Sequence, residues 1–180
     1  MNRLILILGG ARSGKSRFAE GLAARLGARV LFVATAMGED EEMRRRIAGH
    51  RQARPAAWRT LEEPLQLAPA IARQAGNAEV VLVDCLTLWV SNLLLAQGGE
   101  EADADAEEAV LREVAKLIDV YRQGAATFLV IANEVGLGLV PPYPLGRLYR
   151  DALGRANQLL AAAADAVYFM VAGLPLAIKK

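Results

Sequence analysis

The feature that most constrains this chain is an apolar run that passes directly into a glycine-rich turn. Leu4–Leu8 contains only Leu and Ile, and Gly9–Ser16 reads GGARSGKS. A continuous apolar run of this length predicts a strand buried on both faces of a parallel sheet. The turn matches the pattern G-x-x-x-x-G-K-[ST], whose backbone N–H groups gather around a phosphate. The stretch Lys15–Leu26, with apolar residues at helical spacing, predicts a helix whose positive end faces the same phosphate.

This turn predicts a nucleoside triphosphate site. In such a site the lysine places its charge on the outer phosphates, so Lys15 is also a catalytic candidate, and the hydroxyl of Ser16 is a Mg²⁺ ligand. A glycine-rich turn with a solvated lysine is the alternative, but the position between a buried strand and a helix favours the nucleotide site. The predicted contacts in the turn are Gly9, Gly10, Ala11, Arg12, Ser13, Gly14, Lys15 and Ser16.

Strand and helix patterns alternate along the chain, which predicts an α/β fold with a mainly parallel central sheet between two helical layers. With the phosphate-binding turn, this is a P-loop NTPase-like three-layer fold, expected as a single domain over residues 1–180. Strands are expected at residues 4–8, 29–34, near 58, 79–84, 127–132, 166–171 and 176–179. Helices are expected at residues 15–26, 39–50, 65–74, 86–97, 106–123 and 145–164.

Asp84 closes one of the buried strands, Glu79–Asp84. A carboxylate at this end of a strand is where P-loop proteins hold Mg²⁺, so Asp84 is a metal-ligand candidate beside Ser16. Asp84 could instead cap the helix that follows. Asn133 and Glu134 follow another strand, where they could form a turn or, for Glu134, position Mg²⁺ or a substrate hydroxyl.

Composition excludes several classes of protein. Lys+Arg 21 against Asp+Glu 20 leaves a net charge of +1, which gives no reason to expect a nucleic acid partner. The single cysteine, Cys85, rules out an internal disulfide and suits a reducing cytoplasm. No apolar stretch approaches the roughly 18 residues of a membrane span, so membrane insertion is not expected.

His50 is the only histidine, and arginines crowd the sequence around it. A histidine on an apolar helical face is more often a packed core residue, and an arginine run is more often a solvated surface. Clustered guanidinium groups nevertheless match phosphate oxygens well, and they favour a neutral imidazole that can attack phosphorus. His50 is therefore a candidate nucleophile for a covalent nucleotidyl intermediate.

The chain resembles the bifunctional adenosylcobinamide kinase and adenosylcobinamide-phosphate guanylyltransferase family of cobalamin biosynthesis. The resemblance covers nearly the whole chain, and two blocks make it specific: Arg46-Ile47 through His50, and Asn133-Glu134-Val135-Gly136. The remaining resemblance lies in GGARSGKSRFAE at the start, Arg54-Pro55, Trp58, Glu62, Gly138, Val140-Pro141, Gly154-Arg155, Asn157-Gln158-Leu159, Ala162–Asp165, Gly173 and Ile178-Lys179.

The resemblance implies two activities: phosphorylation of adenosylcobinamide with ATP or GTP, and transfer of GMP from GTP to give adenosyl-GDP-cobinamide. It implies that His50 carries the guanylyl group, although some members have a second histidine where this chain has Gly49. It also implies a corrinoid substrate and a homo-oligomer, expected to be a trimer. Beyond the phosphate-binding turn, the implied nucleotide contacts are Ala34, Thr35, Ala36, Arg51, Gln52, Ala53, Arg54, Glu62 and Asp84.

Two other functions fit the residues alone. A P-loop kinase for another small molecule would need no nucleotidyl transfer, and His50 would then be structural. A regulatory switch would bind nucleotide tightly and hydrolyse it slowly. Only the bifunctional enzyme requires a covalent GMP adduct on His50, so that adduct separates the three.

Overall fold

A computed structural model describes residues 2–37, 55–99, 102 and 104–180. They form one seven-stranded sheet in the order β3-β2-β4-β5-β1-β6-β7. All neighbouring strands from β3 to β6 run parallel, and only β7 is antiparallel, so the predicted mainly parallel sheet is confirmed. The strands are β1 (Leu4–Gly9), β2 (Val30–Ala34), β3 (Arg59–Glu62), β4 (Val80–Asp84), β5 (Thr127–Asn133), β6 (Ala166–Val171) and β7 (Leu174–Lys179).

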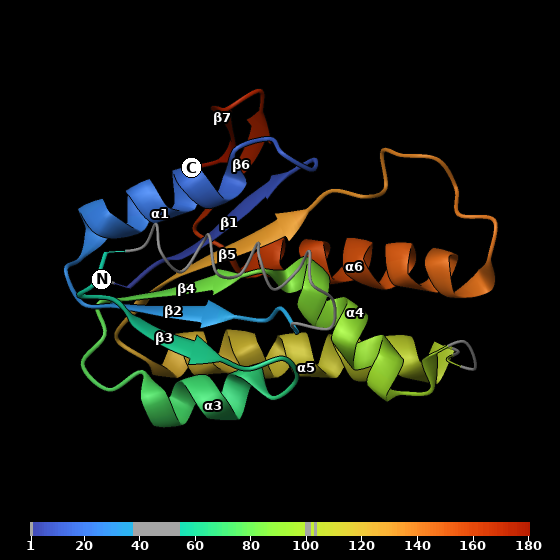
Figure 1. The fold of residues 1–180 in the computed structure, drawn as a ribbon, viewed down its shortest axis with the longest axis horizontal. Helices are drawn as coiled ribbons and strands as arrows, with labels where there is room; N and C mark the ends of the chain where they lie inside the picture. Colours follow the sequence, from blue (N-terminus) through green and yellow to red (C-terminus); the bar gives the residue numbers. More distant parts are fainter. Residues whose placement is uncertain (1, 38–54, 100–101, 103) are drawn as a thin grey trace.

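Helices cover both faces of the sheet (Figure 1). One face carries α1 (Lys15–Leu26), and the opposite face carries α3 (Leu67–Gln74), α4 (Leu86–Ala96), α5 (Ala104–Gln123) and α6 (Pro144–Ala163). This arrangement confirms the three-layer α/β fold. The boundaries differ from the predicted ones by about two residues or fewer, as is usual where helix ends fray. The helix predicted over residues 39–50 lies outside the described residues.

The two faces of each strand build two cores. In β1, Leu4 and Leu6 pack into the larger core with α3–α6, whereas Ile5 and Ile7 pack into the smaller core under α1. All four side chains are at most 3% exposed. Burial on both faces is why the run is continuously apolar rather than alternating.

Burial along α1 and α4 shows which residues of each helix contact the core. In α1 the fully buried residues are Ala19 and Ala23; Phe18 and Leu22 are partly buried against the same core, and only Leu26, at the end of the helix, is exposed. In α4, Trp89 is fully buried, so most of this apolar helix belongs to the core rather than to a substrate pocket. Among the described helices, none combines the length and hydrophobicity that crossing a membrane would require.

Candidate active site

The carboxyl ends of the parallel strands surround a cavity of about 530 Å³. Ligands bind at this edge of open α/β sheets. The cavity brings together most of the predicted site residues that the structure describes, from the phosphate-binding turn, the end of β2 and the end of β4. These residues are Ala11, Arg12, Ser13, Gly14, Lys15, Ser16, Ala34, Ala36 and Asp84.

The backbone of the turn has the conformation that a phosphate cradle requires. Gly9 has φ 152°, and a Cβ there would lie 2.7 Å from both the Met170 carbonyl oxygen and Ser13 Oγ, so only glycine fits. Arg12 (φ 57°) and Gly14 (φ 92°) are left-handed. Alternation between left- and right-handed residues turns successive N–H groups to one side, which forms a concave anion site.

Lys15 is buried at the first turn of α1. The residue is 8% exposed, and its Nζ donates a hydrogen bond of 2.6 Å to the Gly10 carbonyl. Burial lowers the pKa of Lys15 from its ordinary value of 10.5, while the nearby Cys85 and, to a smaller extent, the carboxylate of Asp84 act to raise it. A lysine held in a partly desolvated place is one that an anionic phosphate would stabilise.

The β6–β7 hairpin supports the phosphate-binding turn from outside, which the sequence did not indicate. The Gly173 N–H donates to the Ser13 carbonyl at 3.0 Å. A Cβ on Gly14 would lie 3.2 Å from Gly173 Cα, so the two backbones are in close contact. The antiparallel strand pair β6–β7 therefore helps to fix the position of the turn.

Asp84 lies at the rim of the cavity and does not cap the helix after it. The N-cap residue of α4 is Cys85, so Asp84 precedes the cap position. Ser16 and Asp84 both line the cavity, and their hydroxyl and carboxylate oxygens are ligands that Mg²⁺ accepts alongside water and phosphate. Within the described residues there is no cluster of three or more His, Cys, Asp or Glu that could hold a metal by itself. The donor set therefore fits a nucleotide-bound Mg²⁺.

Four predicted nucleotide contacts in the described residues do not line the cavity: Gly9 and Gly10 at the start of the glycine-rich turn, Thr35 and Glu62. Thr35 is fully buried, and its hydroxyl donates to the Cys85 carbonyl (2.8 Å) and accepts from the Cys85 N–H (2.9 Å). Thr35 thus joins β2 to β4 and fixes its neighbours Ala34 and Ala36, which do line the cavity. Glu62 is exposed at the end of β3, opposite Ala34 in the register. Direct nucleotide contacts by Thr35 and Glu62 stay predictions.

The predicted nucleophile and its neighbours lie outside the described residues. They are His50, Arg51, Gln52, Ala53 and Arg54. Cys85 is the other potential nucleophile near the cavity, but burial raises the pKa of its thiol to about 11. A protonated thiol is a poor nucleophile at neutral pH, so Cys85 does not compete with His50 for that role.

Thr87 and Asn133 also line the cavity, and sequence reasoning assigned no site role to either residue. Thr87 Oγ1 accepts a hydrogen bond of 2.7 Å from the Asn133 N–H, which joins the start of α4 to the end of β5. Thr87 lies in an apolar stretch that carries no site signal. Asn133 carries the signal that identified Asp84, a polar residue directly after a buried strand.

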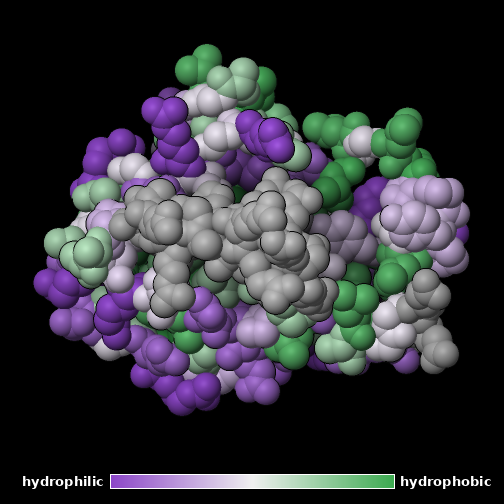
Figure 2. All heavy atoms as spheres, viewed as in Figure 1, coloured by the Kyte–Doolittle hydropathy of each residue, from purple (hydrophilic) through white to green (hydrophobic). Residues whose placement is uncertain are grey.

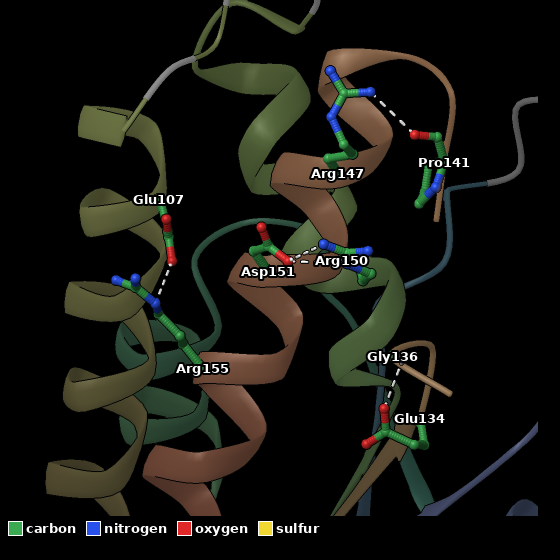
Figure 3. A network of polar contacts seen from close by, with 8 residues as sticks. All are labelled: Glu107, Glu134, Gly136, Pro141, Arg147, Arg150, Asp151 and Arg155. Carbon is green, nitrogen blue, oxygen red and sulfur yellow. Dashed lines mark hydrogen bonds and ion pairs between the residues drawn. The ribbon is translucent and has the colours of Figure 1, made fainter. Parts of the chain in front are cut away.

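Glu134, by contrast, behaves as a turn residue. Its Oε1 accepts the Gly136 N–H at 2.7 Å, at the start of the connection from β5 to α6 (Figure 3). At the other end of that connection, Arg147 Nη1 donates to the carbonyls of Pro141 (3.1 Å) and Pro142 (2.9 Å). These contacts favour the turn over a role in metal binding.

Comparison with known proteins identifies relatives over the whole chain. The family model for cobinamide kinase / cobinamide phosphate guanyltransferase matches residues 5–178. The bifunctional adenosylcobalamin biosynthesis protein CobP of Pseudomonas aeruginosa is 48% identical over 97% of this chain and 96% of its own length. The proteins named CobU of Escherichia coli and Salmonella typhimurium are 44% and 42% identical, each over 98% of this chain and 99% of the relative. Among solved structures, the RadB recombinase aligns with a TM-score of 0.49 and 16% identity, over 93% of this chain and 73% of its own.

Proposed function

The chain belongs to the cobinamide kinase / cobinamide phosphate guanyltransferase family, and from this premise we propose that the cavity at the end of its sheet serves both reactions. The protein is a bifunctional enzyme of adenosylcobalamin biosynthesis that phosphorylates adenosylcobinamide and then transfers GMP from GTP to the product. The observation that carries the assignment to this cavity is the buried Lys15 in a glycine-rich turn, facing Asp84 across a space large enough for a triphosphate.

In the kinase step, a hydroxyl oxygen of adenosylcobinamide attacks the γ-phosphorus of ATP or GTP. The bond from that phosphorus to the nucleoside diphosphate breaks, and the hydroxyl proton passes to solvent. Backbone N–H groups of Gly9–Ser16 hold the phosphates, and the Lys15 ammonium offsets the charge that develops on the leaving diphosphate. Ser16 and Asp84 would hold Mg²⁺, which supplies further charge neutralisation at the phosphates when bound.

In the guanylyl step, we assign the nucleophile to His50. A neutral imidazole nitrogen attacks the α-phosphorus of GTP, pyrophosphate leaves, and GMP stays bound to His50 as a phosphoramidate. A phosphate oxygen of adenosylcobinamide phosphate then attacks the same phosphorus and releases His50. Arg51, Gln52, Ala53, Arg54 and Glu62 are the proposed nucleotide contacts of this step, with Ala34 and Ala36 at the rim after β2 and Thr35 as a further proposed contact between them.

The partners follow from these reactions and from the surface. The substrates are a corrinoid and a purine nucleotide, and we propose that the protein works as a homo-oligomer, with a trimer as the expected number. Exposed apolar side chains on the described surface support self-association, because isolated monomers rarely leave large apolar patches in water. The lone Cys85 suits the reducing cytoplasm, which is the proposed compartment.

The mass of the intact protein tests the guanylyl step directly. Wild type and His50→Ala would each be incubated with Mg²⁺ and either GTP or ATP. We expect a gain equal to one GMP in wild type with GTP only, lost on mild acid treatment as a phosphoramidate should be. His50→Ala should bind GTP and show no gain.

The same samples distinguish the alternatives. If wild type binds GTP and gains no mass, the histidine mechanism is wrong, and the function is that of a kinase or a regulatory switch. An adduct that persists in His50→Ala would place the nucleophile on another residue.

A further inference from the structure

The side chain of Asn133 is a polar group in the nucleotide cavity that the reactions above do not use. Asn133 lines the cavity, yet its side-chain amide makes no hydrogen bond to any residue in the described part of the chain. Other asparagines near this edge are occupied: Asn92 Nδ2 donates to the Thr35 and Pro64 carbonyls. An amide offers two N–H donors, so a hydrogen-bonding capacity is left over inside a ligand cavity.

The backbone around this amide is, in contrast, held from three sides. The Asn133 N–H donates to Thr87 Oγ1 at 2.7 Å, and Asn157 Nδ2 of α6 donates to the Asn133 carbonyl at 3.3 Å. The next N–H, of Glu134, donates to the Gly9 carbonyl at 3.1 Å. These hydrogen bonds fix where the Asn133 side chain starts, so no backbone rearrangement is needed for its amide to reach a ligand, and only side-chain rotation is lost on binding.

The strand order places Asn133 between the two halves of the phosphate site. Strand β5 lies between β4, which ends at Asp84, and β1, which ends at Gly9. Gly9 is opposite Asn133 in the register of β1 and β5. A polyphosphate that extends from the glycine-rich turn toward Asp84 must therefore cross the end of β5. The outer phosphates occupy this stretch, because the lysine and the metal ion of a P-loop site both act on the β- and γ-phosphates.

We propose that the Asn133 amide N–H donates a hydrogen bond to the terminal phosphate of the bound triphosphate. This contact would let the protein distinguish a nucleoside triphosphate from the diphosphate and would hold the γ-phosphoryl group in line for transfer. A neutral donor suits the place, because a carboxylate there would repel the phosphate oxygens. The proposal rests on the proposed function in one respect, that the triphosphate occupies this cavity.

Equilibrium binding of GTP and GDP, measured with and without Mg²⁺, tests the contact. The proteins are wild type, Asn133→Ala and Asn133→Asp, with Asn77→Asp as the control that adds the same charge in an exposed turn before β4, at the opposite edge of the sheet. We expect Asn133→Ala to weaken GTP binding about tenfold and to leave GDP binding nearly unchanged, since hydrogen bonds to charged groups are among the stronger ones. Asn133→Asp should weaken GTP binding further, and Asn77→Asp should match wild type.

The order of the two Asn133 variants separates a ligand contact from a structural role. A structural role predicts that the isosteric Asp variant binds better than the Ala variant, and that GTP and GDP lose affinity together; either result overturns the proposal. Unfolding midpoints without nucleotide show whether each variant is folded. Phosphorylation of cobinamide by wild type is measured in parallel. Turnover by wild type with unchanged GTP selectivity in Asn133→Ala defeats only this inference, whereas no turnover by wild type defeats the proposed function.

Discussion

Lys15 shows how one residue can cost stability and still be required. Its ammonium is partly removed from water, and this burial lowers the pKa of Lys15 from 10.5. A lowered pKa in the folded protein means that folding disfavours the charged form of the lysine. The hydrogen bond to the Gly10 carbonyl offsets only part of this cost, because Gly10 is exposed and water can replace the lysine there.

Replacement of Lys15 by methionine should therefore stabilise the nucleotide-free protein while abolishing turnover. We expect a gain of about 1 kcal/mol in the free energy of unfolding at pH 7, measured by urea titration without ligand. Between the lowered pKa and 10.5 the unfolded chain binds more protons than the folded one, so wild-type stability rises with pH there and the advantage of the variant shrinks.

Lys116→Met is the matched control, because Lys116 is exposed in α5 and pairs with Glu113 at 2.6 Å on the surface. Its effect should stay within about 0.5 kcal/mol. A Lys15→Met protein less stable than wild type at pH 7 would contradict the conclusion that burial of the charge dominates.

The same cavity shows which site residues a sequence can reveal. Lys15, Ser16 and Asp84 were predictable, since a phosphate cradle and a carboxylate after a buried strand each leave a local pattern. Thr87 was not, because its role depends on a hydrogen bond across 46 positions to Asn133, which only the strand order creates. Thr35 was predicted as a ligand contact, but its hydroxyl joins two strands, a use that no local pattern distinguishes.

At the scale of elements, α4 does more than fill the core. It carries two polar side chains that hold the loops after β2 and β3: Asn92 donates to the Thr35 and Pro64 carbonyls, and Trp89 Nε1 donates to the Leu65 carbonyl at 2.8 Å. Both residues are buried. The helix thus determines the position of the rim at Ala36 from inside the molecule.

Asn92→Leu should weaken the affinity for GTP, whereas Trp89→Phe should leave it unchanged. Loss of the Asn92 amide leaves two carbonyls without this donor, so we expect a loss of about 2 kcal/mol in stability and a several-fold weaker affinity for GTP. Trp89→Phe removes one hydrogen bond to Leu65, which does not line the cavity, and should cost about 1–2 kcal/mol with unchanged affinity. Calorimetric titration with GTP and urea unfolding give the two quantities. Equal affinity losses would show that α4 acts through general stability alone.

Element boundaries were largely predictable, but their packing was not. The apolar runs gave the buried strands, and Phe18 and Leu22 of α1 do pack against the sheet, but the fully buried contact of this helix is made by the small Ala19 and Ala23. The support of the glycine-rich turn by Gly173 depends on the antiparallel β7 folding back beside β6. Such contacts depend on how closely backbones approach, which hydrophobic periodicity does not encode.

At the scale of the whole molecule, most of the exposed large apolar side chains in the described residues belong to two segments. Figure 2 shows them at the upper right, where the connection from β5 to α6 projects, and at the top over the β6–β7 hairpin. On the connection, Leu137 is 81% and Leu139 is 96% exposed. The hydrogen bonds at Glu134 and Arg147 fix both ends of this segment, so it presents its leucines on a defined backbone (Figure 3).

These leucines fit a contact between subunits, and Leu139→Asp tests that contact. A charge in the centre of an apolar interface should raise the dissociation constant of the proposed homo-oligomer by about 100-fold, because the carboxylate would be buried without a partner. Sedimentation velocity should then show an oligomer for wild type and a monomer for the variant at the same concentration, with unchanged far-ultraviolet circular dichroism. Ile178→Asp on β7 is the control, since Ile178 is 63% exposed at the other apolar place. If only Ile178→Asp dissociates the oligomer, the interface lies at the β6–β7 hairpin. If wild type is a monomer, the proposal of self-association is wrong.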